Sequence, residues 1–264
     1  MRPDELLETG GVDAPSKPRV KSGISMPSTV CARANSFQGP RRAPRRSTNA
    51  IDVVGLDGFV LFTNSNGVYL GDAVLEPVFE ELERRKAVVY VHPNPSPDPV
   101  AHSLGLPDNL LDFPTDTNRA VAQMHYTNRF ARTPNVKYIF SHAGGSIPYL
   151  AARFAIIDEM SFIAGGEQRG TAADMFRRMY WDTALSASDP VLRMLRDIVG
   201  IDQVMFSIDF PYLRRDLAVS VKQRILDSFE LNHLEKHAVL GGNASHLFPR
   251  LYSSVQRLGK DSES

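Results

Sequence analysis

The segment AVVYVHPNP, residues 87–95, indicates the fold of the whole chain. Its first five residues are apolar, three of them valines, which is typical of a buried strand, and this strand ends at His92 and Pro93. Upstream, LEPVFEELERR (75–85) carries apolar residues at helical spacing, and GFVLF (58–62) is another short apolar run. The order strand, helix, strand predicts a parallel β-α-β unit.

The same alternation continues towards the C-terminus. Strands are expected near 58–62, 88–91, 137–140, 179–181 and 203–207, and helices near 75–85, 117–132, 147–160, 171–178, 189–199, 217–229 and 235–248. Short strands alternating with helices predict a parallel α/β sheet built from five βα units. A closed barrel of this type has eight strands, so the expected fold is an incomplete α/β barrel.

The first 49 residues differ in composition from the rest of the chain. They are rich in Pro, Ser, Gly and Arg and show no helical or strand periodicity, so residues 1–49 are expected to be disordered. The basic run Arg41–Arg46 is interpreted as a solvated tail rather than as a nucleic-acid patch. The partial barrel is expected over residues 50–255, followed by a polar tail over 256–264.

Charge and cysteine content narrow the class of protein. Lys plus Arg and Asp plus Glu both total 30, so the formal net charge is zero and neither nucleic acid nor an anionic membrane is an expected partner. The single cysteine, Cys31, excludes an intrachain disulfide framework. No apolar run is long enough to span a bilayer and no secretory signal is visible, so a cytoplasmic location is expected.

Four ionisable residues stand directly after predicted strands: His92, His142, Asp182 and Asp209. The carboxyl ends of parallel strands hold the active site in α/β folds, and imidazoles and carboxylates are ligands for zinc and similar ions. The pattern therefore predicts a metal site at one rim of the sheet. Each residue has a plainer interpretation as well: His92 marks a turn before proline, and Asp182 caps a following helix.

The remaining candidates are weaker. Other histidines lie in predicted loops or helices and are expected at the surface: His102, His125, His233, His237 and His246. Four aromatic residues close to the predicted rim either line a pocket or pack in the core: Tyr180, Trp181, Phe210 and Tyr212.

Five motifs together carry a family resemblance. VYVHPNP, SHAGGSIPYLAARF, MYWDTALSA, VMFSIDFPY and LGGNASHLF, in this order between Gly55 and Leu251, resemble the amidohydrolase-related decarboxylases. The prototype of that family is aminocarboxymuconate-semialdehyde decarboxylase, and the fungal 6-methylsalicylate and orsellinate-type decarboxylases look closest. The resemblance implies a TIM-barrel-type metal-dependent hydrolase fold, of which the five predicted strands correspond to strands four to eight.

The resemblance also implies roles for individual residues. His92 corresponds to a metal ligand, His142 to a catalytic histidine beside the metal, and Asp209 to a metal-bound aspartate that also serves catalysis. The implied cofactor is a divalent metal, zinc first and manganese as the alternative. Residues expected to contact the substrate are Phe210, Tyr212 and Asn94.

The implied activity is non-oxidative decarboxylation of a small hydroxylated aromatic acid, in aromatic or polyketide secondary metabolism, by a chain that could form a homodimer. One departure matters: the family carries an H-x-H or E-x-H pair on its first strand, and no such pair precedes His92 here. Without that pair metal affinity and activity are expected to fall. A metal-dependent amide or lactone hydrolase and a truncated, inactive remnant remain the alternatives.

Overall fold

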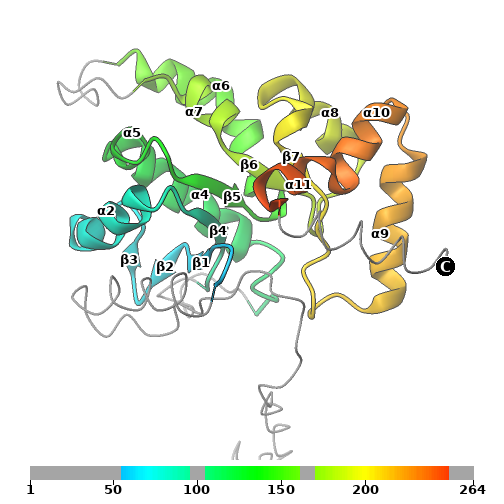
Figure 1. The fold of residues 1–264 in the computed structure, drawn as a ribbon, viewed down its shortest axis with the longest axis horizontal. Helices are drawn as coiled ribbons and strands as arrows, with labels where there is room; N and C mark the ends of the chain where they lie inside the picture. The colour runs from blue at the N-terminus through cyan, green and yellow to red at the C-terminus, as the bar shows by residue number, and fades with distance from the viewer. Residues whose placement is uncertain (1–54, 96–104, 161–169, 250–264) are drawn as a thin grey trace, which may run out of the picture.

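A parallel five-stranded sheet forms the centre of the protein (Figure 1). The computed structural model describes residues 55–95, 105–160 and 170–249. The strands lie in the order β1-β4-β5-β6-β7, with bounds β1 Phe59–Phe62, β4 Val88–His92, β5 Lys137–Phe140, β6 Tyr180–Asp182 and β7 Val204–Met205. Because every pairing is parallel, all the carboxyl ends lie at one edge.

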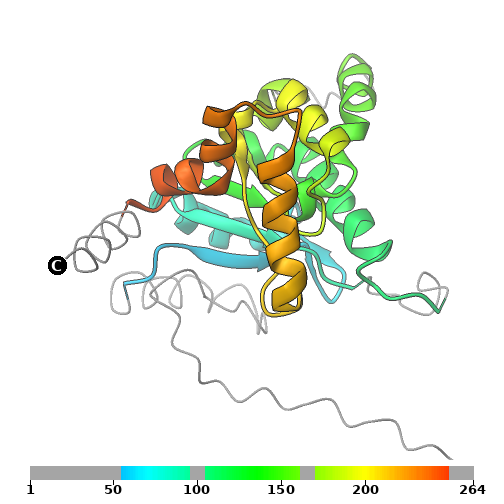
Figure 2. The same ribbon diagram turned by 90° about the vertical axis from the view of Figure 1, so that its right-hand side faces the viewer.

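Helices connect the strands and cover the sheet. Their bounds are α2 Glu76–Arg84, α4 Asp112–Tyr126, α5 Arg129–Arg132, α6 Ile147–Asp158, α7 Ala172–Arg178, α8 Asp189–Ile198, α9 Arg215–Asp227, α10 His233–His237 and α11 Asn243–Leu247. Shorter elements are the hairpin β2 Asn64–Ser65 and β3 Val68–Tyr69, and the turns η2 Ala73–Leu75, η3 His142–Gly144, η4 Ile201–Gln203 and η5 Ala238–Gly242. Figure 2 shows α9 as an upright helix in front of the strands.

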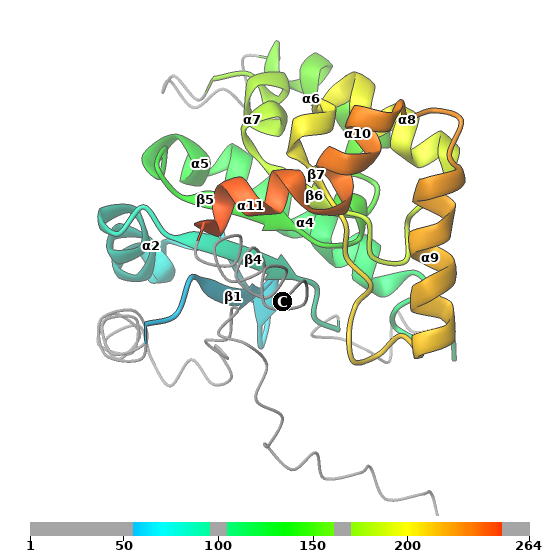
Figure 3. The same cartoon turned by 45° about the vertical axis from the view of Figure 1, so that its right-hand side comes forward.

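The two faces of the sheet differ in what they bury. Side chains alternate along a strand, so Val89 and Val91 of β4 point into the main core beneath the helices, while Tyr90 and His92 point to the other face. That inner face holds a smaller cluster around Ile139 and Met205, which Leu247 and other α11 residues pack against. Figure 3 shows α11 lying across this part of the sheet. The inner face therefore corresponds to the interior of an α/β barrel.

The predicted α/β class and partial barrel are confirmed, and the strand positions agree closely with expectation. Two helix predictions were wrong in detail. The helix expected over 117–132 is two helices, because Asn128 takes a left-handed φ of 60° between α4 and α5. The helix expected over 235–248 is divided into α10, η5 and α11, with a break at Gly241 (φ 173°).

The expected disordered segment 1–49 and polar tail 256–264 lie outside the described residues. In the part of the chain that the structure describes, the longest helices are too short or too polar to cross a lipid bilayer.

Candidate metal centre

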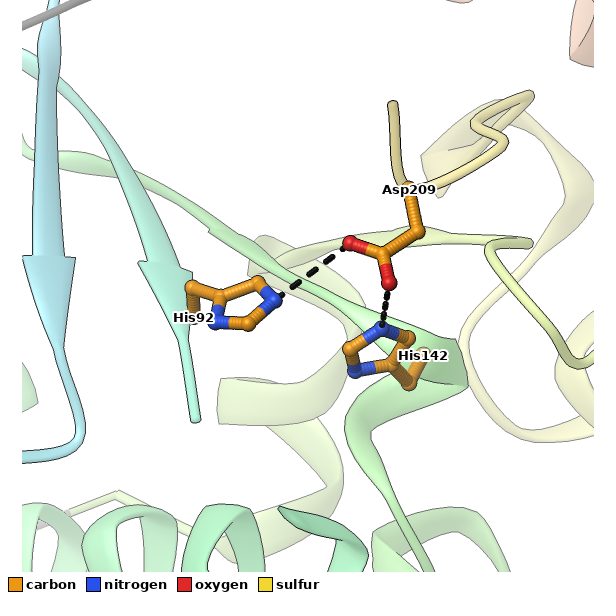
Figure 4. A group of neighbouring side chains, drawn as sticks. All are labelled: His92, His142 and Asp209. Carbon is orange, nitrogen blue, oxygen red and sulfur yellow. Dashed lines mark ion pairs between the residues drawn. The ribbon is translucent and has the colours of Figure 1, made fainter. Parts of the chain in front are cut away.

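Three side chains from three strand ends meet at the carboxyl edge of the sheet (Figure 4). His92 is the last residue of β4, His142 follows β5, and Asp209 follows β7. The sequence predicted all three at this rim, and the structure brings them together. They are the one His/Cys/Asp/Glu group with metal-ligand spacing among residues 55–95, 105–160 and 170–249.

The distances among these side chains suit ligands of one ion. His92 Nε2 lies 3.5 Å from Asp209 Oδ1, and His142 Nε2 lies 3.7 Å from Asp209 Oδ2. Both separations exceed a hydrogen bond, and all the ligand atoms lie within 4.8 Å of one another. Two atoms each about 2.0–2.2 Å from a zinc ion are separated by up to about 4 Å, so a small closure of the group would complete the geometry.

The two imidazoles present unused nitrogen atoms. His92 Nδ1 lies 2.7 Å from the carbonyl oxygen of Pro93, and because a carbonyl only accepts, Nδ1 carries the proton and Nε2 keeps its lone pair. Nε2 of His92 and Nε2 of His142 are both buried without a hydrogen-bond partner. Buried polar atoms are normally satisfied, so these two atoms and the facing carboxylate fit a bound divalent cation.

Asp209 is ionised in this setting. Its side chain is largely buried, yet the facing imidazoles of His142 and His92 hold its pKa well below the usual range, against the opposing effect of burial. Two nitrogen donors and one anionic oxygen donor therefore point into one space.

The backbone that carries His142 is left-handed over four successive residues. The φ angles are 56° at His142, 54° at Ala143, 71° at Gly144 and 66° at Gly145. We expected the glycines of SHAGGS to let the backbone approach a ligand, but the structure shows a different reason. A Cβ on Gly144 would lie 2.1 Å from the ring of Trp181, so that glycine allows close packing on the core.

Asp182 supports the site from behind and does not face the group of three. Its Oδ1 accepts hydrogen bonds from the backbone N–H of His142 (2.8 Å) and of Ala184 (3.0 Å), and its Oδ2 accepts from the hydroxyl of Tyr90 (2.5 Å). Burial raises the pKa of Asp182, and the Tyr90 hydrogen bond opposes that rise. The alternative that Asp182 caps a helix is wrong, because the next helix begins at Asp189.

A second buried carboxylate, Asp116 of α4, supports the loop after β4, and the sequence analysis missed it. Asp116 accepts hydrogen bonds from the hydroxyls of Thr63 and Tyr69 and from Asn64 Nδ2 (2.9 Å). Thr63 Oγ1 in turn accepts from the backbone N–H of Asn94 (3.0 Å). An aspartate on the apolar face of a predicted helix was the available signal, because a buried carboxylate needs donors.

The predicted substrate contacts take different environments. Phe210 and Tyr212 are exposed beside Asp209, whereas the side-chain amide of Asn94 donates to the carbonyl oxygen of Asn64 (3.3 Å). The rings that pack on His92 are Phe62 and Phe113, with centroids 6.2 and 5.7 Å away. Neither had been singled out.

Two further expectations are corrected or resolved. Trp181 belongs to the core rather than to a pocket. His125 was expected at the surface but is buried, because Nε2 pairs with Asp158 Oδ1 at 2.7 Å between α4 and α6.

The chain contains one E-x-H sequence, Glu235-Lys236-His237, but it lies in α10. Glu235 completes a capping box with Asn232 there. This E-x-H therefore serves helix capping and is not the strand-borne metal pair.

Comparison with known proteins gives consistent matches. A family model described as amidohydrolase matches residues 33–250. The chain is 34% identical over 197 residues to a 6-methylsalicylic acid decarboxylase from Penicillium expansum, an overlap covering 74% of this chain and 60% of that protein. The first three curated relatives are spanned over 60% to 63% of their length.

Solved structures agree with the fold. A 5-carboxyvanillate decarboxylase from Sphingomonas paucimobilis is 27% identical with a TM-score of 0.72, over 80% of this chain and 63% of that one. A 5-carboxyvanillate decarboxylase from Novosphingobium aromaticivorans, complexed with manganese and a substituted nitrobenzoic acid, has a TM-score of 0.71 over 80% of this chain and 62% of its own. At 21% identity that second likeness is one of fold alone.

Proposed function

The chain belongs to the amidohydrolase family, and from that premise we propose that its metal centre serves non-oxidative decarboxylation of a small hydroxylated aromatic acid. The observation that carries the proposal is the pair of buried, partnerless Nε2 atoms of His92 and His142, facing the carboxylate of Asp209. The named relatives support the substrate class, since the curated match acts on 6-methylsalicylic acid by its name.

We assign the holding of the metal to His92 and Asp209, with His142 beside it. The donor set of imidazole and carboxylate suits zinc, and manganese is the alternative. When bound, such an ion polarises the carboxylate and adjacent oxygen of a substrate and offsets developing negative charge. The left-handed backbone at His142 directs its Nε2 into the same space as the other two donors.

His142 is the proposed proton carrier. With a proton on Nε2 it can protonate the ring carbon that bears the carboxylate. The bond between that carbon and the carboxylate then breaks, its electron pair returns to the ring, and carbon dioxide leaves. The proton that the ring has gained is replaced on His142 from water, so atoms and charges balance. Phe62 and Phe113 pack on His92 and lie on the side where an aromatic ring would enter.

The direct test measures carbon dioxide released from carboxyl-labelled 6-methylsalicylate by the purified chain, with zinc or manganese added after chelation. We expect slow, metal-dependent release that His92→Ala and Asp209→Ala abolish. His233→Ala, which removes an exposed histidine of α10, is the matched control and should behave as wild type. Release that persists in chelator, or hydrolysis of an amide or lactone without carbon dioxide release, would overturn the proposal.

A further inference from the structure

Asp182 connects three neighbouring strands through one buried carboxylate. It lies at the end of β6 and binds the backbone N–H of His142, which follows β5. Its other oxygen reaches the hydroxyl of Tyr90 on β4, although β5 lies between β4 and β6 in the sheet. The side chain of Asp182 is 1% exposed, so water does not compete for these bonds.

The two ends of this link are the two histidine-bearing segments. Tyr90 precedes His92 by two residues, so both side chains point to the same face of β4. The N–H of His142 belongs to the residue whose left-handed φ of 56° turns its ring towards His92, with ring centroids 5.2 Å apart. A non-glycine residue holds such a conformation only where its surroundings enforce it.

We propose that Asp182 is a positioning residue that fixes the catalytic ring of His142 relative to His92 by holding the backbone of His142 and the side chain of Tyr90 at once. The proposal rests on the proposed function for its consequence, but the positioning itself is a property of the metal-free protein. Without Asp182, the N–H of His142 loses its acceptor and the strained segment 142–145 can relax. The ring would then leave the orientation in which Nε2 faces Asp209.

A buried carboxylate could also serve stability alone, and the chain offers a matched control. Asp158 of α6 binds a histidine nitrogen, His125 Nε2, at 2.7 Å and a backbone N–H, that of Ala172, at 2.8 Å. It makes bonds of the same type among the outer helices, away from the rim. Loss of Asp158 should lower the stability of the fold without moving the ring of His142.

The substitutions separate the links. Asp182→Ala removes all three bonds, whereas Asp182→Asn keeps Oδ1 as the acceptor of both backbone N–H groups and should rescue the position of His142. Tyr90→Phe removes a single hydroxyl and so cuts only the link to β4. Asp158→Ala measures the effect of losing a buried carboxylate elsewhere.

Two measurements on metal-free protein test the position directly. They are the hydrogen-exchange rate of the His142 amide and the nuclear Overhauser contact between the rings of His92 and His142. For Asp182→Ala we expect exchange roughly 100-fold faster and loss of the ring contact, because the amide has lost its only acceptor in the described structure. Tyr90→Phe should raise exchange about tenfold, and Asp182→Asn and Asp158→Ala should leave both values near wild type.

Kinetics and metal binding give the second readout. In Asp182→Ala we expect kcat to fall about 100-fold, with KM and the zinc dissociation constant changed much less, because a displaced proton carrier harms the chemical step. Asp158→Ala should lower the melting temperature and leave kcat unchanged in the folded protein.

Each outcome bears on one proposal. A folded Asp182→Ala variant that keeps the ring contact and slow exchange overturns the positioning role, and so does Tyr90→Phe with both values unchanged if Asp182→Ala does not fold. A wild-type chain that binds no metal and releases no carbon dioxide overturns the proposed function, while exchange and ring contact still decide the role of Asp182.

Discussion

Nε2 of His92 lies 3.5 Å from Oδ1 of Asp209, although His92 ends β4 and Asp209 follows β7 at the edge of the sheet. Parallel pairing explains the meeting, because it sends the carboxyl ends of all five strands to one rim. The twist and curvature of a barrel sheet then turn the side chains of that rim towards a shared centre. A donor set separated by more than 100 positions in the sequence is therefore assembled by topology.

Asp116 should be needed both for stability and for the loop after His92. Asp116→Ala removes the acceptor of Thr63, Asn64 and Tyr69, and we expect the free energy of unfolding to fall by about 3 kcal/mol, since buried donors are left unpaired. Urea unfolding measures this loss. Thr63→Val, which removes one of the donors, should cost about 1–2 kcal/mol. Equal losses for the two variants would contradict a hub role for Asp116.

Gly144 should not tolerate a methyl group. Gly144→Ala places a Cβ 2.1 Å from the buried ring of Trp181, so we expect a loss of about 3 kcal/mol or more, or failure to fold. Gly170→Ala is the matched control, because Gly170 has a similar φ of 72° with nothing within 4 Å of the added Cβ. It should cost only the backbone strain, about 1–2 kcal/mol. Thermal unfolding of the two variants compares steric clash with strain.

Glu81 predicts an acid-side pH dependence of stability. Hydrogen bonds from Arg84 and then Arg85 lower the pKa of Glu81 from 4.5 to about 2. A folded-state pKa below the unfolded value stabilises the fold above pH 4.5, and this contribution is lost as the pH falls towards 2. Glu81→Gln should therefore reduce stability by about 1 kcal/mol at pH 7 and have little effect near pH 2. Unfolding of both proteins across this pH range is the measurement, and a pH-independent difference would contradict it.

The sequence was informative where the signal was local. His92 and Asp209 each follow a short apolar run directly, so periodicity and strand ends sufficed to place them on the rim. The supports behind the rim depend on pairs far apart in the chain: Tyr90 lies 92 positions from Asp182. No local pattern records such a pair. The break at Asn128 was missed for a related reason, because the apolar spacing continues through it while the backbone turns.

The last prediction separates metal holding from proton transfer within the group of three. If His92 and Asp209 hold the ion and His142 carries the proton, His92→Ala should weaken zinc binding far more than His142→Ala does. In the wild type, zinc at about 100 times its dissociation constant should stabilise the fold by about 2.7 kcal/mol, and chelator should reverse this. We expect His92→Ala to lose that stabilisation and His142→Ala to keep most of it while releasing no carbon dioxide. Thermal unfolding with and without zinc measures the first effect, and labelled 6-methylsalicylate measures the second. Equal loss of zinc stabilisation in the two variants would show that His142 is a ligand of the same rank as His92, and the proton would then need another carrier.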